Sequence, residues 1–485
     1  MSATLWVLVG YLVVLVGLAL WGRGESHSLE GYYLAGKKLP FWVVAFSANA
    51  TGESGWLLLG LTGMGYLVGA QAYWVLVGEI IGLVASWGLI SRKLKKLGDE
   101  TGSITIPDVL SAKFDDRYHL IRGIAVAIIL IMVTTYVTAQ ISATGTALTS
   151  FLGWDFKSAV FYGSVIIIGY TFIGGYKAVS YTDVVQGVLM LLGLILVPAA
   201  AIYASDGWSG MVSGLEHQDP NLLKMFALTG DGISGWVAIL SFMAIGLPFL
   251  GVPQMLVRYM SARDDGEIRK ARVMSIIVMI IYLGGAITAG IAGRALFPGL
   301  ENHETIFPTL SSNLFPAIIT GLLLVVVLSA IMSTVDSLLL LSSSAIVRDT
   351  WQKILGSKKT DAQLADYGKV VTLLIGAMGI VFAGVEAKFI FWFVLFAWAG
   401  LGAAFGPVIL GLLYYKRITR EGVIAGMLGG FLTTVIWFRY FKEQNYDLFE
   451  AIPGFAVGFL LTWGVSWLTW TEGEPAADGV HFHPK

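Results

Sequence analysis

Long apolar runs separated by short polar segments repeat along almost the whole chain. A membrane-spanning helix needs about 20 apolar residues to cross a hydrocarbon core about 30 Å thick. The first run has no basic leading segment and no small-residue cleavage site, which favours a retained helix over a signal peptide. The pattern predicts an all-α polytopic membrane protein with about thirteen spans, near residues 4–22, 41–69, 72–91, 120–150, 158–176, 184–204, 233–257, 273–297, 315–346, 370–387, 389–414, 421–438 and 448–469.

Two of these runs are interrupted by residues that weaken a helix. The second contains residues 51–55 (TGESG), and the seventh contains residues 246–253 (GLPFLGVP). Backbone groups freed inside a membrane are tolerated only where they line a cavity. The interruptions open two successive five-helix sets, and an odd number of helices inverts one set relative to the other. Matching interruptions in inverted halves indicate the central site of a transporter.

The basic residues predict the orientation of the chain, because Lys and Arg favour the cytoplasmic side of a membrane. We place the N-terminus outside and assign alternate loops to the cytoplasm, which puts the C-terminus in the cytoplasm. Of the 31 basic residues, only six then lie outside: Lys157, Lys224, Arg294, Lys388, Arg439 and Lys442. This asymmetry favours thirteen spans and places Arg258 in a cytoplasmic loop.

The composition excludes several classes of protein. Hydrophobic residues make up 56% of the chain, charged residues 13%, and the mean hydropathy is +0.76. A soluble domain carries about 25% charged residues, so most of this surface must contact the lipid bilayer. A soluble enzyme and a nucleic-acid-binding protein are excluded, and no motif indicates an obligate protein partner. The chain has no Cys, so it has neither disulfides nor thiolate chemistry.

Ionisable residues at membrane depth are candidates for function because burying them is costly. Four acids lie at this depth, and the sequence predicts no Lys, Arg or His there to balance them: Glu53, Glu79, Asp183 and Asp336. They must therefore be protonated or bind a cation. Ser333 and Ser337 share a helix face with Asp336, and hard oxygen ligands suit an alkali cation. Alternatively, the hydroxyls hold helices together while the acids stay protonated.

Four short motifs carry a resemblance to a known family. They are residues 54–56 (SGW), 170–175 (YTFIGG) followed by 182–183 (TD), 332–337 (MSTVDS) and 398–407 (WAGLGAAFGP). Their order and their positions in the spans resemble the sodium/solute symporter family, and most closely its bacterial sodium/proline symporter branch. The similarity extends from about residue 32 to residue 454.

The resemblance implies a fold and a location. The expected core is an inverted five-helix repeat of the neurotransmitter-symporter type in the bacterial cytoplasmic membrane, with one extra helix before it and two after it. The implied regions are an N-terminal helix and loop (1–39), the first repeat (40–205), an extracellular loop (206–232), the second repeat (233–414), two C-terminal helices (415–470) and a cytoplasmic tail (471–485).

The resemblance also implies binding sites for Na⁺ and for a small-molecule substrate. The sodium site would use backbone oxygens of Ala50, Glu53 and Ala330 with the hydroxyls of Ser333 and Thr334. A possible second sodium ion would bind Asp183, Ser333, Asp336 and Ser337. The implied substrate contacts, to which Glu53 is a candidate addition, are Ser54, Gly55, Trp56, Tyr136, Ile245, Phe249 and Pro253.

The chain departs from the sodium/proline branch at several of these positions. The branch has an acid where this chain has Gly52, and here Glu53 follows one residue later, about 100° further round a helix. Ile245 and Phe249 stand where the branch has Trp and Tyr, and Glu79 has no acidic counterpart. Glu53 is therefore a candidate for binding sodium, for contacting a substrate ammonium group or for carrying a proton.

These observations predict sodium-coupled import of a small polar solute by alternating access, with proline or a related amino acid as the first candidate. A proton-coupled symporter using Glu53 or Asp336 remains an alternative, as does a sodium symporter for a sugar or organic acid. No paired catalytic residues at membrane depth favour an enzyme, and no repeated filter sequence favours a channel.

Overall fold

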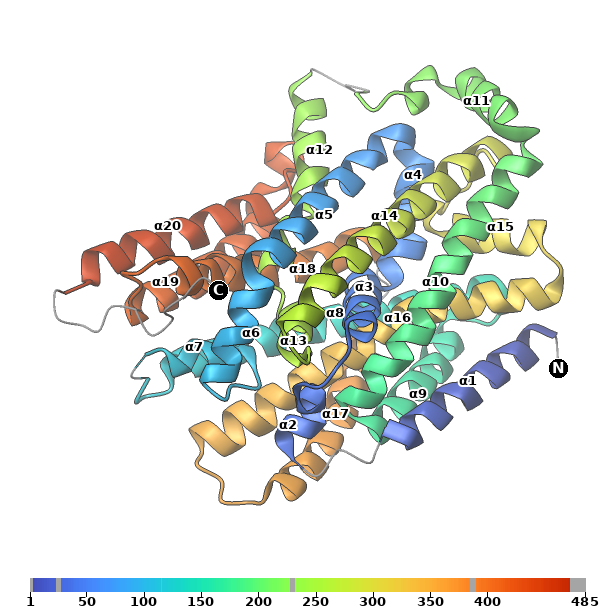
Figure 1. The fold of residues 1–485 in the computed structure, drawn as a ribbon. Coiled ribbons are helices and arrows are strands. Elements are labelled where there is room, and N and C mark those ends of the chain that lie inside the picture. Colours follow the sequence, from blue (N-terminus) through green and yellow to red (C-terminus); the bar gives the residue numbers. More distant parts are fainter. Residues whose placement is uncertain (1–2, 23–27, 115, 227–231, 384–389, 472–485) are drawn as a thin grey trace.

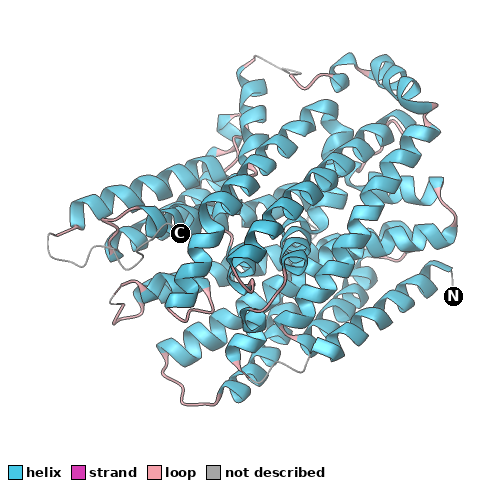
Figure 2. Ribbon diagram, viewed as in Figure 1, coloured by secondary structure: helices cyan, strands magenta, loops and turns pink. Residues whose placement is uncertain are grey.

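The computed structural model describes residues 3–22, 28–114, 116–226, 232–383 and 390–471. Within these residues every regular element is a helix (Figure 2), and the only strand-like contact is an isolated bridge between Leu39 and Ala262. The predicted tail at 471–485 lies outside the described residues, except for its first residue. The all-α architecture predicted from the apolar pattern is confirmed.

A helix lies over each predicted span. These helices are α1 (Ala3–Gly22), α3 (Phe41–Gly55) with α4 (Thr62–Val68), α5 (Tyr73–Ala85), α8 (Leu120–Leu152), α9 (Phe156–Gly174), α10 (Tyr176–Ala204), α12 (Ile233–Ala244) with α13 (Pro253–Ser261), α14 (Asp265–Leu296), α16 (Ala317–Ser344), α17 (Asp361–Ala383), α18 (Ile390–Tyr414), α19 (Arg420–Ile436) and α20 (Ala451–Thr469). By length and composition, eleven helices of the described chain are able to cross a membrane. One of these eleven is the continuous run Phe41–Glu100, within which Gly69 has a φ of 63° between α4 and α5.

Shorter helices connect the long ones. They are α2 (Leu29–Leu34), α6 (Ser91–Glu100), α7 (Ile106–Ala112), α11 (Gly207–Gln218) and α15 (Ile306–Leu314). In Figure 1, α3, α8 and α16 lie in the middle of the bundle, whereas α1 and the pair α19–α20 lie on opposite sides. Helix α1 packs on α9, α10 and α16, and α19 and α20 pack on each other and on α18. The three flanking helices therefore enclose a core that runs from α3 to α18.

The outer helices expose large apolar side chains. Trp6 of α1, Leu240 of α12 and Leu460 of α20 are each more than half exposed, with exposed fractions of 63%, 54% and 69%. Extended apolar surface of this kind is unfavourable in water and marks a surface that contacts another apolar phase. The exposed side chains therefore fit a bundle surrounded by lipid.

A close backbone contact fixes where α5 lies. An added Cβ on Gly246, between α12 and the helical turn Leu247–Leu250, would be 2.0 Å from the carbonyl oxygen of Gly78. An added Cβ on Gly82 would be equally close to the carbonyl oxygen of Gly246. Only glycine permits this approach, which places the buried face of α5 directly against the second interrupted helix.

Candidate functional site: two broken helices around α16

Helix α3 is distorted at the residue that the sequence predicted as an interruption. Ser54 has φ 55° and ψ −173°, and its hydroxyl accepts a hydrogen bond from the backbone N–H of Trp56 at 3.1 Å. The backbone N–H of Gly55 instead donates to the side-chain oxygen of Gln140 on α8 at 2.9 Å. The break therefore exchanges helical hydrogen bonds for contacts with neighbouring side chains, and it exposes α3 backbone groups to α8 and α16.

The expected sodium ligands of α3 and α16 lie together. The Ser333 hydroxyl donates to the carbonyl of Ala50 at 2.9 Å and to that of Ala330 at 3.1 Å. The Thr334 hydroxyl donates to the carbonyl of Thr51 at 3.0 Å. All of these residues are fully buried. The structure thus brings four of the five expected ligands into one cluster of oxygens.

The fifth expected ligand, the carbonyl of Glu53, has a local partner. It accepts a hydrogen bond from the backbone N–H of Trp56, just after the distorted residue. A carbonyl oxygen has two lone pairs, so this contact leaves one of them available. The side chain of Glu53 points to a different set of neighbours, which are described below.

A basic residue lies at the depth of the acids, which corrects the expectation that none would be there. Arg258, predicted in a cytoplasmic loop, is on α13 and is fully buried. Its guanidinium group donates to Thr51 at 2.7 Å, to Ser47 at 3.2 Å, to Asp183 at 3.3 Å and to the Ser337 hydroxyl. Asp183 also accepts a hydrogen bond from Ser47 at 2.6 Å. The acid is therefore paired, because α13 resumes after the break and carries Arg258 inward.

Asp336 contacts helix α9. Its carboxylate accepts a hydrogen bond from Thr171 on α9. Ser337, the next residue of α16, instead contacts Thr51 at 3.0 Å and Arg258. Of the residues predicted for a second sodium ion, the structure therefore joins Asp183 and Ser337 through Arg258, and Asp336 faces another helix.

The second interrupted helix is packed against α18. The carbonyl of Ile245 accepts a hydrogen bond from the indole N–H of Trp398 at 3.1 Å. The same indole makes an edge contact with Phe249, at 5.0 Å between ring centroids. Pro253 then begins α13, where its missing N–H costs nothing. All three predicted positions are buried, and the backbone between α12 and α13 is held by a Trp from the motif at 398–407.

Two predicted aromatic residues lie beside the α3 break. Tyr136 of α8 forms a side-chain hydrogen bond with Ser54. Trp56 stacks on Phe391 with 5.5 Å between ring centroids, and its indole N–H has no hydrogen-bond partner within the described residues. These contacts bring both predicted substrate-contact aromatics to the same break.

Glu53 and Glu79 form a contact that the sequence did not predict. A side-chain hydrogen bond links the two carboxyl groups, which are 1% and 3% exposed. One oxygen of each carboxyl group has no partner within the described residues, and neither group has an ion pair there. Two carboxyl groups can share a hydrogen bond only when a proton lies between them, so the pair differs chemically from the Asp183–Arg258 ion pair.

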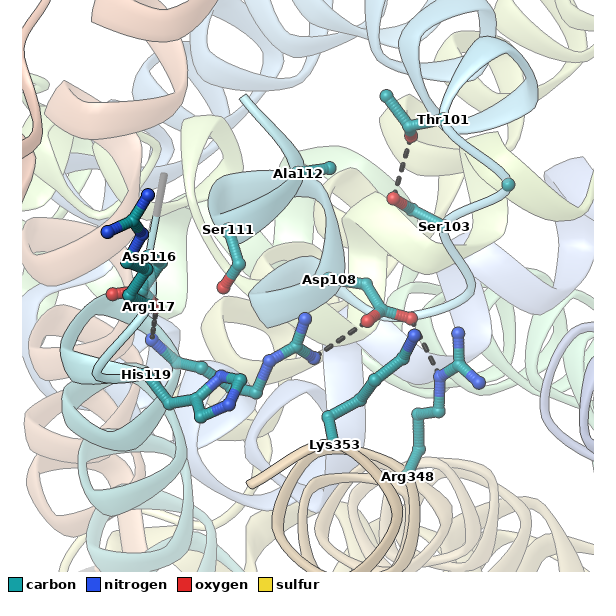
Figure 3. A pocket seen from close by; sticks show the side chains of 12 residues that line it. Thr101, Ser103, Asp108, Ser111, Ala112, Asp116, Arg117, His119, Arg348 and Lys353 are labelled. Carbon is teal, nitrogen blue, oxygen red and sulfur yellow. Dashed lines mark hydrogen bonds and ion pairs between the residues drawn. The ribbon is translucent and has the colours of Figure 1, made fainter. Parts of the chain in front are cut away.

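A separate polar cavity of about 350 Å³ lies at the end of the bundle that carries α7 (Figure 3). Asp108 binds Arg122 at 2.7 Å and Arg348 at 2.9 Å. Burial alone would raise the pKa of Asp108, but the charges of Arg348 and Arg122 and their hydrogen bonds lower the pKa below its usual value. Arg122 also binds Asp349. This network joins α7 to α8 and to the helical extension of α16 (Ala345–Ile354), outside the central site.

Sequence reasoning missed three kinds of residue in the centre. Arg258 follows the last apolar residue of its span, so the hydropathy pattern placed it outside. Gln140 is uncharged, although its position one helical turn after Tyr136 is a usable signal. Ser47 and Thr51 carry hydroxyl groups without a distinguishing motif. Their contacts with Asp183 depend on how α3, α10 and α13 pack together.

Comparisons with known proteins show which family this chain resembles. The model of the sodium:solute symporter family matches residues 32–430. The high-affinity proline transporter PutP of Bacillus subtilis is 35% identical over 471 residues, covering 96% of this chain and 98% of that protein. A sodium/proline symporter of Staphylococcus aureus is 33% identical over 476 residues, covering 96% of this chain and 92% of that protein.

Solved structures share the fold. A Na⁺-coupled sialic acid symporter in a substrate-bound, outward-open state matches with a TM-score of 0.79 at 20% identity, over 96% of this chain and 98% of that one. A nucleobase-cation-symport-1 family transporter matches with a TM-score of 0.57 at 14% identity, over 94% and 98%. The predicted transporter fold is confirmed. With the family model covering most of the sequence, the chain belongs to the sodium:solute symporter family.

Proposed function

We propose that this symporter uses the inward sodium gradient to import a small amino acid, with proline as the first candidate. The observation that carries the proposal is the hydroxyl contact of Ser333 and Thr334 with the carbonyls of Ala50 and Thr51. These hydroxyl and carbonyl oxygens lie at the break of α3, where the ion and the substrate would meet. The names of the relatives in Bacillus subtilis and Staphylococcus aureus support proline as the substrate to test first.

The oxygen cluster suits sodium chemically. Alkali cations prefer carbonyl, hydroxyl and carboxylate oxygens, and the cluster offers no sulfur or imidazole ligand. The proposed ligands are the carbonyls of Ala50, Glu53 and Ala330 and the hydroxyls of Ser333 and Thr334. Each hydroxyl now donates its proton to a carbonyl and keeps lone pairs for a cation.

Sodium bound there would couple the two helices. An ion between α3 and α16 would hold the distorted segment at Ser54 in one arrangement, ready for the substrate. Coupling requires the ion to bind more tightly in one access state than in the other, because equal affinity shifts nothing. At a membrane potential of 100 mV each inward cation contributes about 2.3 kcal/mol, which supplies the driving force.

The proposed substrate contacts surround the two breaks. Substrate would lie between the α3 break, the aromatic side chains of α8 and α3, and the segment between α12 and α13, with contacts from Glu53, Ser54, Gly55, Trp56, Tyr136, Ile245, Phe249 and Pro253.

A second sodium ion at Asp183, Asp336 and Ser337 would compete with the protein itself. Arg258 already donates hydrogen bonds to Asp183 and Ser337, so the ion and the guanidinium group require the same oxygens. We therefore propose the second sodium site only for a state in which the Arg258 guanidinium has moved away from Asp183 and Ser337. Transport of a single sodium ion per cycle does not require Arg258 to move.

The orientation and the regions also belong to the proposal. We place the N-terminus outside and the C-terminus in the cytoplasm of a bacterial cell, with repeats at 40–205 and 233–414 and flanking helices at 1–39 and 415–470. The imbalance of basic residues between the two sides supports this orientation.

One observation favours a second candidate, a proton-coupled symporter. The Glu53–Glu79 hydrogen bond requires a shared proton, and a carboxyl group that holds a proton at the site of coupling is what such a transporter needs. Asp336 is the other candidate proton carrier.

Uptake by the purified protein in proteoliposomes separates these proposals. We expect accumulation of radiolabelled proline above equilibrium with an inward sodium gradient, and none when choline replaces sodium. Accumulation driven by a pH gradient in sodium-free vesicles would show that protons, rather than sodium, are the coupling ion. Equilibration without accumulation would contradict coupled transport altogether.

A further inference from the structure

The geometry points to Glu53 and Glu79 as a joint binding site for the cationic nitrogen of the substrate. The inference rests on the proposed function, because it assigns a role within the same central site. It narrows the substrate class to solutes that carry an amine or ammonium group, such as amino acids. It disfavours neutral sugars and simple organic acids.

The pair joins the first broken helix, α3, to α5, which packs directly against the second interrupted helix. Glu53 precedes the distorted Ser54 of α3. Glu79 lies on α5, where an added Cβ on Gly246 would be 3.0 Å from its Cα atom. The α5 backbone reaches this position only because Gly78 and Gly246 lack side chains. The carboxyl pair is therefore built into the fold between the helices whose interruptions define the central site.

The protein does not complete the hydrogen bonding of the pair. Within the described residues no Lys, Arg or His pairs with either group, and Glu53 Oε2 and Glu79 Oε2 accept no hydrogen bond. A buried polar atom without a partner is costly. A single ammonium group from outside the protein would supply the missing donors to both carboxyl groups.

Donors for the other end of an amino acid lie at the same break. The amide of Gln140 is oriented by the backbone N–H of Gly55, which its oxygen accepts, and its own N–H₂ group has no partner within the described residues. The indole N–H of Trp56 is likewise buried and unpartnered. The Gln140 amide and the Trp56 indole do not depend on the acids. Both are donors from which a substrate carboxylate could accept hydrogen bonds.

Tyr136 connects the two ends of the site. Its hydroxyl forms a hydrogen bond with Ser54, the residue that follows Glu53. Tyr136 and Gln140 are one turn apart on α8 and so share a face. The acceptors and the unpartnered donors thus border the same aromatic side chain, as a site for a small zwitterion requires.

Binding measurements with three probes test the inference. The probes are L-proline, L-prolinamide, which keeps the cationic nitrogen, and N-acetyl-L-proline, which keeps only the carboxylate. In saturating sodium we expect the wild-type protein to bind proline and prolinamide and to reject N-acetyl-L-proline. Glu53→Gln and Glu79→Gln should each weaken binding of the first two probes about tenfold to hundredfold, because each removes hydrogen bonds to a charged group.

Control variants separate a specific loss of substrate binding from a loss of folding. Glu421→Gln, an exposed acid on α19, should leave all three affinities unchanged, and a sodium-induced thermal shift identifies folded variants. If Glu79→Gln does not fold, Glu79→Asp replaces it and should weaken proline binding less than a neutral side chain would. Proline binding that survives in the folded variants, or equally tight binding of N-acetyl-L-proline, overturns the inference and leaves proline transport intact.

The proteoliposome uptake assay distinguishes failure of proline as the substrate from failure of the carboxyl pair as the amine-binding site. If the wild-type protein accumulates another amine-bearing solute but not proline, proline is wrong and the carboxyl pair stands. If it accumulates a neutral sugar or an organic acid without a cationic nitrogen, both fail together.

Discussion

Two buried acidic sites adjoin the broken helix α3, and they differ in how the protein balances their charge. Asp183 lies 3.3 Å from Arg258 and accepts a hydrogen bond from Ser47 at 2.6 Å. Glu53 and Glu79 have each other and no basic partner within the described residues. Because an unpaired buried charge is costly, we infer that the first site is complete within the protein, whereas the second requires a ligand or a proton.

A further acidic site resembles the first. Asp108 at the far end of the bundle binds both Arg122 and Arg348 (Figure 3), and these contacts hold α7 against α8 and the extension of α16. The comparison indicates that acids with a resident Arg fix the packing of helices. We expect Glu53 and Glu79, which have no basic partner within the described residues, to serve binding instead, so the two kinds of site should respond in opposite ways to loss of charge.

The largest expected effect comes from separating Asp183 from Arg258. Arg258→Met leaves Asp183 buried without its partner, and breaking a buried pair by removing one member costs about 3–5 kcal/mol. We expect a marked decrease in the thermal unfolding temperature of the detergent-solubilised protein, measured without substrate.

A double variant shows whether charge is the cause. Arg258→Met with Asp183→Asn removes both charges and should recover much of the lost stability. If the double variant is as unstable as the sum of the single variants, the two residues act independently and the balanced-pair interpretation is wrong.

The ion pairs of Asp108 with Arg122 and Arg348 should also contribute to stability, and a pH series tests this contribution. Its pKa is lowered in the folded protein, so its contribution to stability is present above the unfolded pKa, about 4, and is lost as the pH falls through the folded value. Asp108→Asn should cost about 1.5–3 kcal/mol at neutral pH. The difference in unfolding temperature between wild type and variant should shrink below about pH 4. A difference that stays constant on acidification would contradict the assignment.

These contrasts also show what the sequence was able to predict. The helices and both interruptions follow from apolar length and from Gly and Pro, which act locally. The charge balance depends on packing. Arg258 reaches Asp183 only because α13 restarts at Pro253, and Glu79 reaches Glu53 only through the close approach of α5 to Gly246. The Ser333 contact with Ala50 was expected from family resemblance rather than from the spacing of residues.

Removal of a hydroxyl from the proposed sodium cluster should change ion affinity more than stability. Ser333→Ala should raise the sodium concentration needed for half-maximal uptake about tenfold, which corresponds to about 1.4 kcal/mol. Ser342→Ala is the matched control, since Ser342 is equally buried on α16 and its hydroxyl donates only to its own helix, to Leu338 at 2.9 Å. Equal sodium dependence in both variants would remove Ser333 from the site.

The smallest expected effect on stability belongs to Glu79→Gln, and it decides between the two classes of acid. A Gln amide can donate to Glu53 as the protonated carboxyl group does, so the hydrogen bond survives and the substitution introduces no new unpaired charge. We expect the free energy of unfolding without substrate to change by less than about 1 kcal/mol. In contrast, Asp183→Asn leaves Arg258 without its counter-charge and should cost several times more. If the two substitutions destabilise the protein equally, Glu79 is part of the structural framework. If Glu79→Gln is nearly silent in stability yet loses substrate affinity, the unbalanced pair is maintained for binding.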